Sequence, residues 1–263
     1  MLLVSILAIA CYLVATILLI KRLRTQEQGG KHLILTMGLI AVVLHGYALH
    51  FALNTTAGLD FGFTNVLSLA SWFICGLLMI AVMRNPVENL GSIVFPMGLA
   101  SLALQQWMPT THIINAAETP GIHIHILFSI LAYSLLALAA VQAVLLSIQE
   151  KQLHNRHPGG FIRALPPLET MEHLLFQMII IGFVLHSMSL MSGIFYLDDM
   201  FAQHLVHKTI LSFLAWGLFA ILLIGRWKYG WRGRTAVRWT LSGFVTLLLA
   251  YFGSKYVLEI ILA

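Results

Sequence analysis

The stretch 121–134, GIHIHILFSILAYS, places two histidines at the start of an apolar run that continues to residue 147. A run of roughly 18 or more apolar residues is long enough to cross the hydrocarbon core of a membrane as an α-helix. Such runs recur along the whole chain of 263 residues, of which 59% are hydrophobic and 10% charged, with a mean hydropathy of +0.89. Since soluble domains average about 25% charged residues, this composition indicates an integral membrane protein.

We therefore predict an all-α fold, a polytopic integral membrane bundle of about eight transmembrane helices that forms a single domain over residues 1–263. The spans are expected at residues 2–20, 33–53, 64–83, 92–107, 122–147, 174–197, 209–224 and 240–262. The first run has no basic segment before it and no small-residue cleavage site after it. It is expected to be a retained helix rather than a signal peptide.

Most lysines and arginines fall in every second loop between the spans, and the densest group is RWKYGWRGRTAVRW at 226–239. Because cytoplasmic loops carry an excess of positive charge, these loops are expected inside and both termini outside. Only Lys208 and Lys255 lie on the outer side of this scheme. A basic and aromatic collar at a membrane face explains the formal charge of +5. The expected partner is thus the lipid bilayer, and no nucleic-acid partner is expected.

The predicted spans carry histidines but no acidic residue near their middle, which disfavours an ion-coupled pump or carrier. Neutral imidazole is a good ligand for haem iron and for zinc. Zinc is the weaker alternative, because no cysteine pairs with the histidines and no HExxH spacing occurs. Cys11 and Cys75 are expected to be small apolar fillers.

Helical geometry separates the two histidines of the quoted stretch. At about 100° per residue, His123 and His125 point to nearly opposite sides of one helix. His125 shares its face with Ser129, Ala132 and Leu136, a stripe on which small residues let another helix or a flat ring approach. His125 is therefore the inward candidate for a metal or cofactor.

Two further histidines lie within predicted spans at the depth of the hydrocarbon. His45 lies about a dozen residues into the second span, and His186 lies midway along the sixth. A lone histidine in a helical bundle is often a hydrogen-bonded core residue that joins helices. For His186 both interpretations remain open, a helix-joining core residue and an iron ligand. For His50, near the interface, the core interpretation is favoured.

The chain resembles the cytochrome c assembly superfamily of CcsA, CcmC and HemX, most closely its YpjD branch. The resemblance rests on LHGYALHF (44–51), TNVLSLASW (64–72), GIHIHILFSILAYSLL (121–136) and the carboxyl-terminal part from LPPLETMEHLL (165–175) to LLLAYFGSKYVLE (247–259). Members of the CcsA type handle haem at the outer surface of the membrane. The resemblance therefore implies haem as a cofactor and a place in the bacterial inner membrane, with cytochrome c assembly or haem-biosynthesis proteins as partners.

Position by position, the resemblance implies haem-iron ligands at His125, the external position, and at His45, the intramembrane position. Lys208 and Trp216 match residues that follow the family's tryptophan-rich loop. This chain has no tryptophan in residues 198–207, and Ile224 stands where a second intramembrane histidine is expected. A replacement ligand would come from His186, His204 or His207. Because the haem-lyase signature is incomplete, enzymatic activity is not expected, and no catalytic residue is assigned.

Two hypotheses of function follow. In the first, the protein binds or handles haem on the outer side of the plasma membrane through His125 and His45, with His186 and His207 as further candidates. In the alternative, it is a cofactor-free, HemX-like regulatory or accessory partner that acts through its cytoplasmic loops. A small-solute or metal permease is a third option, but it lacks a polar path through the spans.

Overall fold

The structure is a computed structural model that describes residues 2–25, 29–56, 58–114, 120–155, 165–196 and 206–253. Among these residues lie the helices α1 (Leu2–Thr25), α2 (Lys31–Leu53), α3 (Phe63–Val82), α4 (Gly91–Trp107), α5 (Pro120–His154), α7 (Leu168–Tyr196), α8 (Val206–Tyr229) and α9 (Gly233–Leu248). A 3-10 turn, η1 (Glu88–Leu90), precedes α4, and a π-helical turn, η2 (Leu249–Gly253), continues α9. Seven of these helices are long and apolar enough to span a membrane. The predicted polytopic helical membrane fold is confirmed.

The fourth helix, α4, is the exception in length. It has 17 residues and contains Pro96. At about 1.5 Å per residue it measures roughly 25 Å, slightly less than a hydrocarbon core of about 30 Å. It nevertheless occupies the predicted fourth span and is well packed. A Cβ added at its Gly98 would lie 2.9 Å from Cys75 Sγ and 3.1 Å from Tyr12 Cζ, so the absence of a side chain permits this close approach.

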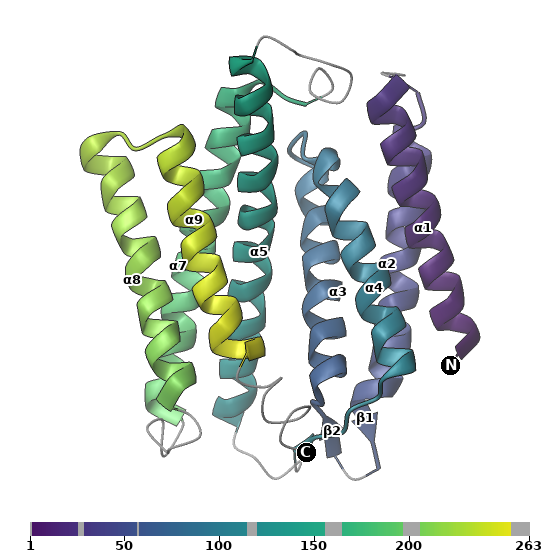
Figure 1. Ribbon diagram of the computed structural model, residues 1–263. Coiled ribbons are helices and arrows are strands. Elements are labelled where there is room, and N and C mark those ends of the chain that lie inside the picture. Colours follow the sequence, from purple (N-terminus) through teal and green to yellow (C-terminus); the bar gives the residue numbers. More distant parts are fainter. Residues whose placement is uncertain are drawn as a thin grey trace. The chain divides into compact units, whose positions relative to one another are not determined.

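The described residues form two compact units, and the prediction of a single domain stays a prediction. The first unit comprises residues 1–116 and 151–167, and the second comprises residues 117–150 and 168–263. In the first unit α1 packs on α2 and α4, and α3 packs on the same two helices. Consecutive helices of this unit run in opposite directions (Figure 1). Large side chains that are almost completely buried in it include those of Tyr12, Leu19, Leu78, Phe95 and Leu102.

A small antiparallel sheet lies at the end of the first unit where α2 ends and α3 begins (Figure 1). Its strands are β1 (Asn54–Thr55), β2 (Gly58–Asp60) and β3 (Ile113–Ile114), in the order β1-β2-β3. Leu59 lies opposite Asn54 on one side and Ile114 on the other. The sequence predicted only loops here, because strands of two or three residues are too short to show an alternating pattern.

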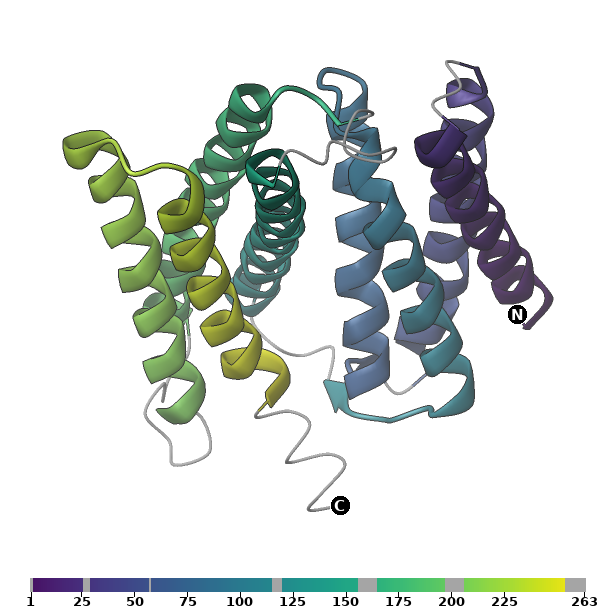
Figure 2. The ribbon, with the colours of Figure 1, turned by 45° about the horizontal axis from the view of Figure 1, so that its top comes forward.

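In the second unit α5 packs against α7, α7 against α8, and α8 against α9 (Figure 2). Gly182 of α7 lies against Leu136 of α5, where an added Cβ would be 2.7 Å from the leucine Cδ2. Further along the same pair of helices, Gln142 Nε2 donates a hydrogen bond of 2.9 Å to the Met171 carbonyl. A close apolar approach and a polar contact thus fix α5 beside α7.

The basic run at 226–239 is mostly helical. Helix α8 continues to Tyr229 and α9 begins at Gly233, earlier than the predicted start at residue 240. Gly230 ends α8 in the left-handed region, with φ of 64°, and its N–H donates to the Arg226 carbonyl at 3.1 Å. This is the αL cap that glycine adopts without a steric penalty. The predicted continuation of the last span to residue 262 lies outside the described residues.

Apart from Lys208, the described lysines and arginines lie near one end of each unit. In the first unit Arg22 and Lys31 contact Glu88 at 3.9 and 3.0 Å, at the end opposite to the sheet. In the second unit the cations lie where α8 passes into α9. The position of these cations agrees with the loop charges from which the orientation was predicted. The placement of both termini outside stays a prediction. Lys255, one of the two outer lysines of that prediction, lies outside the described residues.

Gly225 permits the turn between α8 and α9 to fold back on α8. A Cβ added there would lie 2.3 Å from Trp231 Cε3, whereas one at Gly217, on the same helix, would meet nothing within 4 Å. We expect Gly225→Ala to lower the free energy of unfolding by about 1–3 kcal/mol, because the stacked indole must move. Gly217→Ala should leave stability unchanged or raise it by up to about 1 kcal/mol.

Thermal unfolding of the two purified variants in detergent measures the difference. Equal midpoints for Gly225→Ala and Gly217→Ala would show that the indole does not restrict this position.

Candidate functional site

His125 lies in the first turns of α5, against the last turns of α7. The approach is close because Gly121 packs on the Tyr196 ring, where an added Cβ would be 2.2 Å from Cδ1. His125 Nδ1 lies 3.0 Å from the Ser189 carbonyl oxygen and 3.1 Å from Ser192 Oγ. Two polar groups of α7 therefore hold one edge of a partly buried imidazole.

These contacts determine which ring nitrogen carries the proton. The Ser192 hydroxyl donates to the Ser189 carbonyl at 2.8 Å, so its oxygen can only accept from the imidazole. Nδ1 faces two acceptors and must be the N–H donor. A metal-binding histidine commonly donates its second ring N–H to a backbone carbonyl in this way.

The other nitrogen of His125 keeps its lone pair. Its nearest described polar neighbour is Ser129 Oγ at 3.4 Å, and that hydroxyl donates to the His125 carbonyl at 2.7 Å. Nε2 thus receives no strong hydrogen bond from Ser129. The donor set fits a haem-iron ligand, in which a neutral imidazole offers Nε2 to the metal.

The face of α5 expected from the sequence is the packed face. Ser129 Oγ and Ser189 Oγ are 2.7 Å apart, and Ala132 and Leu136 are buried further along the helix. His123 is exposed and lies on the other side. The prediction that only one histidine of this stretch faces inward is confirmed for these described residues.

His45 is completely buried in the first unit. Its Nδ1 lies 3.2 Å from the Tyr12 hydroxyl and its Nε2 lies 2.9 Å from Ser68 Oγ. The structure therefore joins His45 to α1 and α3 through both ring nitrogens. His125 and His45 belong to different units.

The remaining candidates differ in their surroundings. His186 is buried, and its Nε2 donates to the Ser212 carbonyl of α8 at 3.1 Å, the helix-joining contact considered from the sequence. His207 is exposed in the first turn of α8. His204 lies outside the described residues. Within the described part of the chain, no three histidine, cysteine or acidic side chains come together as a metal site.

Trp216, which the resemblance matches to a family residue, belongs to the α7–α8 interface. Its ring stacks on Phe183 with centroids 5.4 Å apart, and its Nε1 donates to Ser187 Oγ at 2.9 Å. Ile224, at the position of the expected histidine, is half exposed. Nothing in these contacts replaces the missing tryptophan-rich surface.

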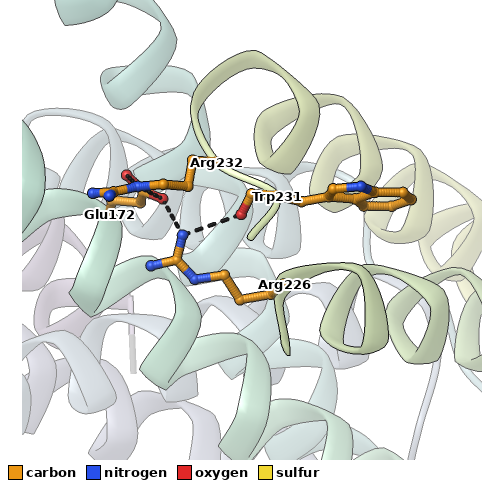
Figure 3. Close-up of polar contacts among 4 residues, drawn as sticks. All are labelled: Glu172, Arg226, Trp231 and Arg232. Atoms are coloured by element: carbon orange, nitrogen blue, oxygen red, sulfur yellow. Dashed lines mark hydrogen bonds and ion pairs between the residues drawn. The ribbon is translucent and has the colours of Figure 1, made fainter. Parts of the chain in front are cut away.

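Sequence reasoning missed a buried carboxylate at the other end of the second unit. Glu172 Oε1 accepts from Arg226 at 2.7 Å and from Arg232 Nε at 3.1 Å, and its side chain is 7% exposed (Figure 3). Arg226 also donates to the Trp231 carbonyl at 3.1 Å and lies 4.5 Å from the Phe176 ring centroid. The signal available in the sequence was a second acid, three residues after Glu169, at the point where the apolar run of α7 begins.

The fold defines a class: a multi-pass helical membrane protein with polar side chains paired between helices. The chain matches the cytochrome C assembly protein family over residues 32–262. It is 34% identical to inner membrane protein YpjD of Escherichia coli over 259 residues, 98% of each chain. It therefore belongs to the cytochrome c assembly family, and it is a multi-pass protein of the bacterial inner membrane.

More distant relatives agree with this placement. A 28.8 kDa protein of Azospirillum brasilense is 29% identical over 206 residues, 74% of this chain and 76% of its own. Cytochrome c biogenesis protein CcsA of Prochlorococcus marinus is 23% identical over 172 residues, 56% of this chain and 54% of its own. No solved structure matches the chain significantly.

Loss of the Glu172 carboxylate should destabilise the second unit. Glu172→Gln leaves two guanidinium groups without their acceptor, and because Arg226 and Arg232 are partly exposed we expect a cost of only about 1–3 kcal/mol. Glu169→Gln, the same change on an exposed residue of the same helix, is the matched control and should be neutral. Thermal unfolding in detergent compares them, and an equal effect of both substitutions would contradict this role for Glu172.

Proposed function

We propose that the protein binds haem in the half of the membrane that faces outward, and that His125 Nε2 would hold the iron. The observation that carries this proposal is the arrangement around one imidazole. The Ser189 carbonyl and the Ser192 hydroxyl accept from Nδ1–H, which leaves the Nε2 lone pair available. Membership of a family associated with haem supports the same reading.

The residues of this chain have separable tasks in that function. Haem, when bound, would supply the iron that the imidazole holds. The protein would then present or transfer this haem to another protein. Ser192 and the Ser189 carbonyl fix the tautomer and the ring plane of the imidazole, which lowers the entropy lost on ligation. The Ser129 hydroxyl is committed to the backbone of its own helix, so it does not compete for Nε2.

Haem content of the purified protein tests the proposal. After expression with a haem supply, we expect a Soret band in the wild type and loss of most of that band in His125→Ala, because an axial ligand is removed. His123→Ala, two residues away and exposed, is the matched control and should keep the band.

A colourless wild-type preparation would contradict the proposal. So would a band that survives in His125→Ala with unchanged position and intensity.

The alternative, a cofactor-free accessory membrane partner, rests on a different observation. The basic collar of α8 and α9 is partly neutralised within the protein, since Arg226 and Arg232 contact Glu172 and Arg234 contacts Glu150 at 3.7 Å. The exposed collar residues beyond these pairs include Lys228, Arg238, Trp227 and Tyr229. Cations left for a partner with an acidic surface are thus Lys228 and Arg238.

Charge reversal separates this alternative from haem binding. If the collar recognises a partner, Lys228→Glu combined with Arg238→Glu should abolish complementation of a deletion strain without lowering the unfolding temperature, and His125→Ala should be silent. Sensitivity to His125→Ala together with insensitivity to the double reversal would reject the accessory role.

A further inference from the structure

The first unit contains a continuous line of hydrogen-bonded side chains that begins at His45. Ser68 Oγ donates to Gln105 Oε1 at 2.9 Å, and Gln105 Nε2 donates to Asn65 Oδ1 at 2.7 Å. Asn65 Nδ2 in turn donates to the Asp60 carbonyl at 3.1 Å. The line therefore runs from the middle of α2 through α3 and α4 to strand β2.

The order of donors along the line fixes the tautomer of His45. The Ser68 proton is committed to Gln105, so Ser68 Oγ must accept, and His45 Nε2 carries the hydrogen. Nδ1 is then the acceptor of a hydrogen bond that the Tyr12 hydroxyl donates at 3.2 Å. The only lone pair of this imidazole is already used, which is the opposite of the situation at His125.

Burial closes the remaining approach to His45. Its side chain is 0% exposed, Ser68 is 0% exposed, and the Tyr12 ring, also 0% exposed, meets the imidazole edge to face with centroids 5.9 Å apart. Tyr12 belongs to α1 and is fully buried. An iron atom at Nδ1 would have to displace its phenol from the contact with the imidazole. At Nε2 it would break the bond to Ser68 on which Gln105 and Asn65 depend.

The far end of the line secures the sheet. Asp60, 6% exposed, accepts from the backbone N–H groups of Gly62 at 2.9 Å and His112 at 2.8 Å through one carboxylate oxygen. Phe61 N–H donates to the His112 carbonyl at 2.8 Å. The segment after α4 is thereby tied to the segment before α3 at the residue where the buried line ends.

We infer that His45 is a positioning residue, the inner anchor of a polar line that holds the β1-β2-β3 sheet, and not an iron ligand. The donor set of the first unit does not fit the haem-iron ligand that the family resemblance implies at this position. The protein then carries at most one haem per chain, in the second unit. This haem count rests on the proposed function, whereas the role of His45 in holding the sheet does not.

Haem stoichiometry tests the first consequence. We expect no more than one haem per wild-type chain, measured as the pyridine haemochrome against protein by amino-acid analysis. Tyr12→Phe and His45→Gln should leave that ratio unchanged in the folded fraction. Two haems per wild-type chain, falling to one in His45→Gln while the fold is retained, would overturn the inference.

Hydrogen exchange of the sheet amides tests the second consequence, that His45 helps to hold the sheet. This test can be made even if the protein binds no haem. We expect the amides of Phe61, Gly62 and His112 to exchange about ten-fold faster in His45→Leu, since the line loses its inner anchor. His32→Leu, an exposed histidine on the same helix, should leave them unchanged. Tyr12→Phe, which removes a single hydroxyl from the core, should accelerate exchange by a smaller factor. It replaces His45→Leu as the test if the leucine variant fails to fold.

Two results would overturn the positioning role. One is unchanged exchange at the sheet in a folded His45→Leu protein, or in Tyr12→Phe if the leucine variant is unfolded. The other is an equal acceleration in His32→Leu, which would mean that the sheet responds to any change in α2. A colourless protein with accelerated sheet exchange in His45→Leu would refute the haem proposal and retain the positioning role.

Discussion

Inside a membrane, a polar group has no water to bond with, and every donor and acceptor must find a partner within the protein. The helices meet this requirement for the backbone. For the side chains it is met between helices: Tyr12, His45 and Ser68 join α1, α2 and α3, and Ser189 and Ser192 of α7 hold His125 of α5. The same requirement that joins the helices therefore sets the chemistry of each histidine.

His45 and His125 show how identical side chains acquire different capacities. At His45 the neighbouring proton donors and acceptors use both nitrogens, so the ring is a structural element of the first unit. At His125 the acceptors lie on one edge alone, and the second nitrogen is left for a ligand. A family pattern that marks both positions cannot separate these cases, because it records residue type and not the direction of hydrogen bonds.

The charged residues obey the same constraint at the ends of the helices. Glu88 in the first unit and Glu172 in the second each form ion pairs with two cations that come from different parts of the chain. A carboxylate with little exposure is tolerated there because the cations offset the loss of hydration. In the second unit this arrangement also joins the turn between α8 and α9 to α7, so Arg226 and Arg232 of the basic run have a structural role.

The sequence by itself determined the membrane class, the positions of the spans and the inward face of α5. These follow from local properties, namely runs of apolar residues and the helical angle between neighbours such as His123 and His125. The family assignment was likewise available from motifs along the chain. Helix ends were less well predicted, since the cap at Gly230 lets α8 and α9 extend into a run of charges that reads as a loop.

Only the tertiary structure decided which partners each polar side chain has. The sheet pairs Asp60 with Ile113, and the polar line joins Ser68 to Gln105, contacts between residues far apart in the chain that leave no periodic signal. The Glu172 cluster arises in the same way, since Arg226 reaches it from α8 and Arg232 reaches it from the turn that follows α8. Protonation of a histidine depends on such distant neighbours, and this is why the sequence identified the candidate ligands and the fold distinguished between them.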